Sequence, residues 1–125
     1  MIKRVISMLA TVFVAAAILT PTASAKESAG CNWFAKEPVI STTGRIMGVG
    51  GRTGCTNKIN LRVEVRRVID NWPDQTVASG TYWYFVTGSL TVYGDMQSGC
   101  HNYFTETIWE GTSTKIQSGV VRACK

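Results

Sequence analysis

The most regular feature of the sequence is an alternation of apolar and polar residues near its middle. Apolar residues stand at Ile59, Leu61, Val63 and Val65, and polar residues occupy the positions between them. Successive side chains of an extended strand point to opposite faces of a sheet. This period of two therefore predicts a strand over residues 59–66, with one buried face and one solvated face.

Glycines and other turn-forming residues divide the rest of the chain into short segments. Residues 48–54 carry four glycines and are expected to form a turn or a mobile loop. Residues 70–74, 94–99 and 110–112 are also rich in residues that turn the chain. Further strands are expected at residues 38–47, 76–79, 81–87, 90–93, 100–109 and 115–124.

Composition favours strands over helices throughout the chain. Val, Ile and Thr number 28 among residues 26–125, against 6 for Leu plus Ala, and stiff β-branched side chains suit strands. The sequence therefore predicts an all-β fold, a small disulfide-stapled β-sandwich (Ig-like or Greek-key barrel) with roughly six to eight short antiparallel strands.

The N-terminal residues have the pattern of a secretory signal. Lys3 and Arg4 precede the apolar run of residues 5–19, and Ala23-Ser24-Ala25 supplies a small-residue cleavage site. We expect residues 1–25 to be a signal peptide and residues 26–125 to form a single secreted, extracellular domain.

Charge and hydropathy argue against two classes of protein, those that bind nucleic acid and those that span a membrane. The net charge of the chain is +5, and cleavage would remove Lys3 and Arg4 and leave +3. This balance is too mild for a nucleic-acid-binding surface. No segment after residue 25 is apolar enough to span a bilayer, so an integral membrane protein is not expected.

The cysteines Cys31, Cys55, Cys100 and Cys124 all follow the predicted signal. An oxidising compartment makes disulfides the expected state, and the absence of a C-x-x-C pair argues against a metal or other cofactor. Each of the intervals 31–55 and 100–124 is C-x23-C, which favours pairing of neighbours. An Ig-type pairing of Cys55 with Cys100 or Cys124 remains the alternative.

Few residues suggest catalysis. His101 is the only histidine, and we interpret it as an ordinary surface or hydrogen-bonded residue. Glu106 and Glu110 are the nearest pair of acids of the kind that glycoside cleavage uses. Gly111 places Glu110 in a turn, and we interpret both acids as solvated. Hydrolase, phosphate-loop and metalloprotease motifs are missing from the sequence, so we do not expect an enzyme.

The run Tyr82-Trp83-Tyr84-Phe85 is the most informative candidate for a functional surface. Neighbouring side chains of a strand face opposite ways, so two of the four aromatic residues are expected to point outward. Outward rings on a rigid sheet suit the binding of sugars or proteins, although packing against neighbouring strands is the alternative. The other tryptophans, Trp33, Trp72 and Trp109, are further candidates.

A cluster of basic residues lies on and after the alternating strand. Arg62 and Arg66 share its polar face with Glu64 between them, and Arg67 follows. We expect ion pairs across strands or protection of a sheet edge. Binding of an anionic surface, such as a cell-wall polymer or a lipid headgroup, is the alternative.

In architecture the sequence resembles the proteinaceous α-amylase inhibitors of actinobacteria. These are small all-β proteins with two sequentially paired disulfides, and Gly54-Cys55 leading into an alternating strand resembles their second cysteine. The Trp-Arg-Tyr triplet of those inhibitors is missing here, where the segment holds Trp33-Phe34-Ala35. The resemblance therefore extends to the fold and not to the inhibitory site.

Together these features predict a small, secreted, monomeric binding protein without catalytic activity. The first hypothesis is an extracellular antagonist, inhibitor or antimicrobial-type module that acts on a protein target or a competing cell. The alternative is a carbohydrate or cell-wall binding module that uses Tyr82, Trp83, Tyr84 and Trp109 as stacking platforms. A small secreted hydrolase is the third and weakest hypothesis.

Overall fold

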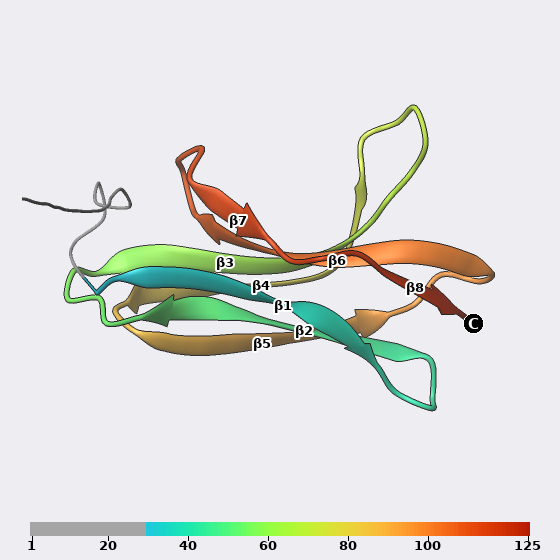
Figure 1. Cartoon of the computed structure of the whole chain (residues 1–125), viewed down its shortest axis with the longest axis horizontal. Helices are drawn as coiled ribbons and strands as arrows, with labels where there is room; N and C mark the ends of the chain where they lie inside the picture. Colours follow the sequence, from blue (N-terminus) through green and yellow to red (C-terminus); the bar gives the residue numbers. More distant parts are fainter. Residues whose placement is uncertain (1–29) are drawn as a thin grey trace, which may run out of the picture. The chain divides into compact units, whose positions relative to one another are not determined.

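A computed structural model describes residues 30–125, and the predicted signal peptide lies outside the described residues. The described chain is built of strands alone, and it holds no helix that could span a membrane (Figure 1). The strands are β1 (Asn32–Ile40), β2 (Arg45–Thr53), β3 (Ile59–Arg67), β4 (Gln75–Phe85), β5 (Gly88–Asp95), β6 (Cys100–Trp109), β7 (Lys115–Gln117) and β8 (Val121–Cys124).

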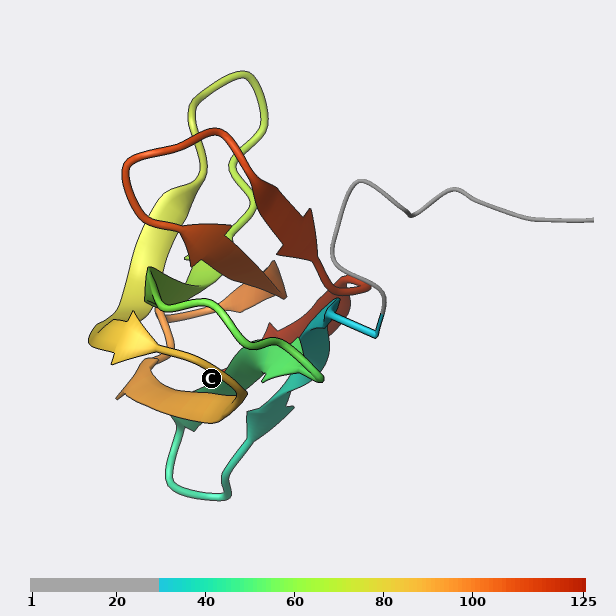
Figure 2. The same cartoon turned by 90° about the vertical axis from the view of Figure 1, so that its left-hand side faces the viewer.

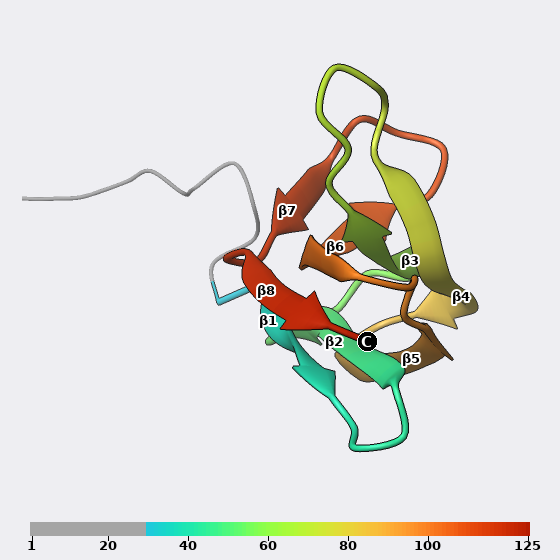
Figure 3. The same ribbon diagram turned by 90° about the vertical axis from the view of Figure 1, so that its right-hand side faces the viewer.

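The strands form two antiparallel sheets that pack face to face (Figure 2, Figure 3). The smaller sheet has the order β1-β2-β5. The larger sheet has the order β4-β3-β6-β7, and β8 also pairs with β6. This arrangement confirms the predicted all-β, disulfide-stapled sandwich.

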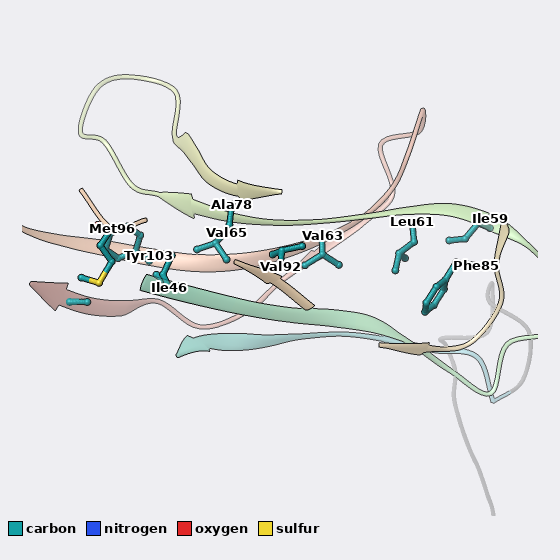
Figure 4. Packing of buried hydrophobic residues seen from close by; sticks show 11 residues of the cluster. Ile46, Ile59, Leu61, Val63, Val65, Ala78, Phe85, Val92, Met96 and Tyr103 are labelled. Atoms are coloured by element: carbon teal, nitrogen blue, oxygen red, sulfur yellow. The ribbon is translucent and has the colours of Figure 1, made fainter. Parts of the chain in front are cut away.

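The core lies between the sheets and is centred on β3. Leu61, Val63 and Val65 are completely buried, as the alternation of apolar residues predicts (Figure 4). Ile46 of β2 and Val92 of β5 meet them from the smaller sheet. Full burial of one such side chain contributes about 2 kcal/mol, so this row of residues holds the two sheets together.

The glycine-rich segment is a strand rather than the predicted loop. Most of residues 48–54 belong to β2, whose central positions are buried. A Cβ atom at Gly48 would collide with Val65, and one at Gly50 would collide with Thr107. The glycines therefore allow the two sheets to approach closely, and the prediction that they form a turn is wrong.

Three further strand predictions also need correction. The predicted strand over residues 115–124 is two strands, β7 and β8, separated at residues 118–120. The predicted strand over residues 38–47 is divided by a turn at residues 42–44, where Gly44 has a φ of +83°. The predicted division near Gly80 is absent, because β4 passes through it without interruption. Gly80 faces Val92 closely, which explains a glycine inside a strand.

Both disulfides join neighbouring cysteines. Cys31 is bonded to Cys55, and Cys100 is bonded to Cys124. The second bridge joins residues that face one another in the register of β6 and β8. The Ig-type pairing is therefore excluded, and the pairing favoured by the equal spacing is confirmed. Two disulfides in a chain of this size are typical of extracellular proteins.

Candidate functional site

The aromatic run ends in a β-bulge at the edge of the larger sheet. Ile59 pairs with Phe85 and Leu61 pairs with Tyr82, so three steps along β4 oppose two steps along β3. Tyr84 lies within this bulge and has a φ of +60°, in the left-handed region. A bulge of this kind bends the strand and redirects its side chains.

The bulge exposes three of the four aromatic side chains. Tyr82, Trp83 and Tyr84 are 54%, 58% and 74% exposed, whereas Phe85 is buried in the core. Three aromatic side chains are exposed, not the two that were predicted to point outward. The extra residue breaks the alternation of faces at Tyr84, and Tyr82 is exposed because β4 is an edge strand. We refer to Tyr82, Trp83 and Tyr84 as the aromatic bulge.

The rings of the aromatic bulge lie on different sides of the edge strand. Tyr82 shares the inner face of the sheet with its partner Leu61, and its ring meets that of Phe85 edge-on at 5.3 Å. Trp83 is the next residue along the strand and faces the outer side. The aromatic bulge is thus a ridge around a sheet edge and not one flat platform.

Arg52 supports this ridge from inside the sandwich. It is 1% exposed, and its Nη2 donates hydrogen bonds to the backbone oxygens of Phe85 and Val86 at 3.1 and 2.6 Å. The same nitrogen donates to the backbone oxygen of Asn57 at 2.6 Å. The chain that leaves the aromatic bulge is therefore fixed to the smaller sheet.

A second contact holds the backbone of the bulge itself. The amide of Tyr84 donates to the side-chain oxygen of Asn60 at 3.2 Å. Asn60 is the β3 residue that lies opposite the extra residue of β4. Its side chain occupies the place where the regular ladder is interrupted, which stabilises the left-handed conformation of Tyr84.

A shallow hollow lies beside the ridge. Tyr82, Tyr84 and Phe85 form one wall, and the turn at residues 86–89 forms the other. Its volume is about 360 Å³. Exposed rings next to a hollow can pack against apolar groups while the tyrosine hydroxyls form hydrogen bonds.

The other predicted aromatic candidates are not part of the aromatic bulge. Trp72 is 74% exposed, in the loop before β4, and residues 75–81 of β4 separate it from the aromatic bulge by about 23 Å. Trp109 is half-buried and stacks on Trp33 at 6.3 Å, against the core. The structure therefore groups Tyr82, Trp83 and Tyr84 and keeps Trp72 away from them. Trp109 faces Leu61 from β6 as Tyr82 does from β4, but it is half-buried and engaged with Trp33.

The acids considered for catalysis are engaged in ion pairs. Glu106 is 3% exposed, lies 3.4 Å from Nζ of Lys115 and accepts a hydrogen bond from Gln117 at 2.6 Å. Glu110 pairs with Arg62 at 2.9 Å. The interpretation of Glu106 as a solvated acid is wrong, because β7 and the neighbouring strands cover it.

Sequence reasoning missed a closer pair of acids. Glu64 of β3 lies opposite Glu106 in the register of β3 and β6, and Glu64 is also buried, at 7% exposure. Arg62 and Arg66 approach the Glu64 carboxylate at 3.1 Å each. The alternation of β3 places Glu64 on the outer face, but only the strand register brings it beside Glu106.

In this network each buried carboxylate, that of Glu64 and that of Glu106, lies beside at least one positively charged side chain. The predicted ion pairing across strands is confirmed for Arg62, which pairs with Glu110 beyond β6, whereas Arg66 pairs with Glu64 of its own strand. Among residues 30–125, no group of three His, Cys, Asp or Glu side chains is arranged to hold a metal ion. Neither family models nor curated proteins show a match to the chain.

Proposed function

We propose that this is a secreted, non-catalytic binding protein that inserts the aromatic bulge into a concave site on an extracellular protein and thereby inhibits or antagonises it. The observation that carries the proposal is the exposure of Tyr82, Trp83 and Tyr84 side by side on a bulged edge strand. Tryptophan and tyrosine dominate the binding energy of protein interfaces.

The rigidity of the ridge supports this proposal. Arg52 and Asn60 fix the backbone on both sides of the bulge. A partner that binds these rings therefore has little conformational entropy to remove. The left-handed conformation of Tyr84 also points to function, because such strain gathers at binding sites.

The direction of the rings favours a protein cleft over a polysaccharide surface. Stacking on a polysaccharide chain requires rings that share one plane, whereas Tyr82 and Trp83 belong to opposite faces of the edge strand. A projecting ridge instead complements a hollow on another protein. The carbohydrate module remains the alternative function, supported by the tyrosine-lined hollow.

The test is a binding panel with matched variants. The protein would be assayed for inhibition of purified secreted hydrolases, for inhibition of bacterial growth, and for co-sedimentation with cell walls and insoluble polysaccharides. Trp83→Ala is the test variant. Trp72→Ala is its control, because Trp72 is similarly exposed but distant from the aromatic bulge.

We expect inhibition of a hydrolase or of growth that is lost in Trp83→Ala and kept in Trp72→Ala. Co-sedimentation with polysaccharide alone, lost in Trp83→Ala, would replace this proposal with the carbohydrate module. Inertness in all three assays would overturn both. Hydrolytic activity lost in Glu106→Gln would overturn the non-catalytic part.

A further inference from the structure

The two disulfides differ in their exposure to solvent. Cys31 and Cys55 are each 5% exposed, so the bridge between them is buried. Cys100 and Cys124, which form the other bridge, are both exposed residues. Exchange of a disulfide with a thiol requires the thiolate to reach a sulfur atom, so the rate of exchange depends on this access. The fold therefore protects the first bridge and leaves the second open to reagents.

The strand register explains why the second bridge is exposed. Cys100 of β6 lies opposite Cys124 of β8, and Ala123, the neighbour of Cys124, is buried in the core. Successive side chains of a strand point to opposite faces, so the Cys100–Cys124 bridge lies on the outer face of the larger sheet. Among residues 30–125, β8 pairs with β6 alone (Figure 3), so the bridge also lies at a sheet edge.

The exposed bridge is distant from the aromatic bulge. Leu61, near the start of β3, pairs with Tyr82 of the bulge, whereas Arg67 at the end of β3 lies opposite Tyr103 of β6. Cys100 lies beyond Tyr103, at the first residue of β6. The rise per residue of a strand separates the two ends by at least about 20 Å. A reaction at this bridge is therefore independent of the proposed function.

Arg122 places a positive charge beside the bridge. It lies two residues from Cys124 on β8, so the two side chains share the outer face of the sheet. Cys100, Arg122 and Asp70 border the same hollow, which has a volume of about 310 Å³. The charge of Arg122 attracts an anionic thiolate and stabilises the thiolate that leaves a broken bridge, whereas the charge of Asp70 acts against both.

We propose that the Cys100–Cys124 bridge is a site of thiol–disulfide exchange with the thiol of another molecule. Residues 30–125 contain no free cysteine, so the attacking thiol is external. Its thiolate forms a bond to one sulfur of the bridge, and the bond between the two cysteines breaks. The other sulfur leaves with the electron pair and takes up a proton. The products are a mixed disulfide and one protein thiol, and a second external thiol converts the mixed disulfide into the second protein thiol.

Opening of the bridge removes the covalent attachment of β8. The strand has four residues, and it is otherwise held by its pairing with β6, by the burial of Ala123 and by two backbone hydrogen bonds between Gly99 and Lys125. So few contacts allow local opening. We therefore expect the backbone amides of β8 to exchange with solvent at least about tenfold faster after selective reduction, with those of β2 unchanged.

The test uses reduced glutathione as the probe on the folded protein, followed by alkylation at timed intervals and peptide mass mapping. We expect Cys100 and Cys124 to react at least about tenfold faster than Cys31 and Cys55. The same reaction in concentrated urea is the control. Both bridges close loops with a sequence separation of 24, so the unfolded chain should lose them at similar rates.

Three outcomes in the folded protein would overturn the proposal. These are equal rates for the two bridges, faster loss of the Cys31–Cys55 bridge, and absence of any reaction at Cys100 and Cys124. Equal rates would mean that the bridges open only when the whole domain unfolds. A faster reaction of the buried bridge would mean that exposure does not control the exchange.

A matched pair of variants tests the contribution of charge. Arg122→Gln should slow the exchange with glutathione about twofold, because it removes a positive charge close to the bridge. Lys58→Gln removes a positive charge from an exposed position beside β3 at the other end of the sandwich, where salt screens its effect on the bridge. Equal rates for the two variants would contradict the electrostatic part of the proposal.

A second reagent identifies the source of the thiol. Reduced thioredoxin, a protein dithiol, would replace glutathione in the same assay. Selective opening of the Cys100–Cys124 bridge by thioredoxin at a lower concentration than by glutathione would support the proposal with a protein thiol as the source. Selective opening by glutathione alone would support it with a small thiol as the source. Opening of both bridges at equal rates by either reagent would overturn it.

Discussion

The positively charged side chain of Arg52 is buried. Backbone oxygens of three residues accept its hydrogen bonds. Asn57, Phe85 and Val86 supply these acceptors, and the guanidinium group also lies 5.6 Å from the centre of the Trp33 ring. Asn57 lies in the loop after β2, and Phe85 and Val86 lie at the end of β4. One residue therefore fixes the end of the molecule that bears the aromatic bulge.

Replacement of Arg52 by Met should lower the free energy of unfolding by at least about 3 kcal/mol, because it leaves several backbone oxygens buried without donors. Equilibrium denaturation in urea would measure this loss. Arg45→Met is the control, since Arg45 forms an exposed ion pair that contributes less than about 1 kcal/mol. A loss below about 1 kcal/mol in Arg52→Met would contradict the assigned role of this residue.

Tyr84 adopts a left-handed conformation that costs a residue with a Cβ atom about 1 kcal/mol. Asparagine tolerates this conformation better, and Tyr84 is 74% exposed and loses little burial on replacement. Tyr84→Asn should therefore stabilise the fold by about 0.5 kcal/mol while weakening target binding. Thermal unfolding and a binding assay on the same variant test both parts. A variant that binds as tightly as the parent would contradict the role of Tyr84 in binding.

Strand β2 is the element in which local pattern and tertiary packing disagree most. Its glycines disfavour a strand by intrinsic propensity, yet Gly48 and Gly50 face the larger sheet at positions where no Cβ fits. Close approach of the sheets outweighs the propensity of the residues. The large buried side chain of Arg52 occupies the end of the same strand, so β2 combines very small and very large residues.

Gly50→Ala should lower stability by about 2 kcal/mol, because the added methyl group collides with Thr107 in a packed interior. Gly119→Ala is a matched control. A methyl group at Gly119 meets only the end of the flexible Glu37 side chain, which can move aside. Urea denaturation would compare the two, and equal stabilities would contradict the account of close sheet packing.

The sequence predicted β3 correctly because its alternation is a local signal of burial on one face. The bulge at Tyr84 could not be predicted, because it depends on the pairing of β4 with β3. The placement of Glu64 opposite Glu106 has the same origin, since strand register brings together residues that are distant in the chain. Tyr82, Trp83 and Tyr84 were found from the sequence, but their shared exposure required the structure.

At the scale of the whole molecule, the two disulfides close equivalent loops in the two sheets. One bridge joins the start of β1 to the loop after β2, and the other joins β6 to β8. Residues 30–125 provide a modest core for a domain of their length. Cross-links therefore contribute a large part of the net stability.

Replacement of Cys100 and Cys124 together by Ser should lower the free energy of unfolding by about 3 kcal/mol, the loop-closure contribution expected for a loop of this length. The pair Cys31 and Cys55 should behave similarly, since the sequence separation is 24 in both. Denaturation of each double variant measures the loss. Thiol titration of the unfolded parent should detect no free cysteine in residues 30–125, and a titratable pair would contradict the assigned bridges.

The measurement that tests the central claim most directly is the affinity of the parent, Trp83→Ala and Trp72→Ala for the protein target that the binding panel identifies. The two tryptophans are both highly exposed, at 58% and 74%, so neither change should disturb the core. If the aromatic bulge is the binding site, Trp83→Ala weakens binding by about 2 kcal/mol or more, and Trp72→Ala binds as the parent does. Equal affinities of the parent and Trp83→Ala would contradict the claim.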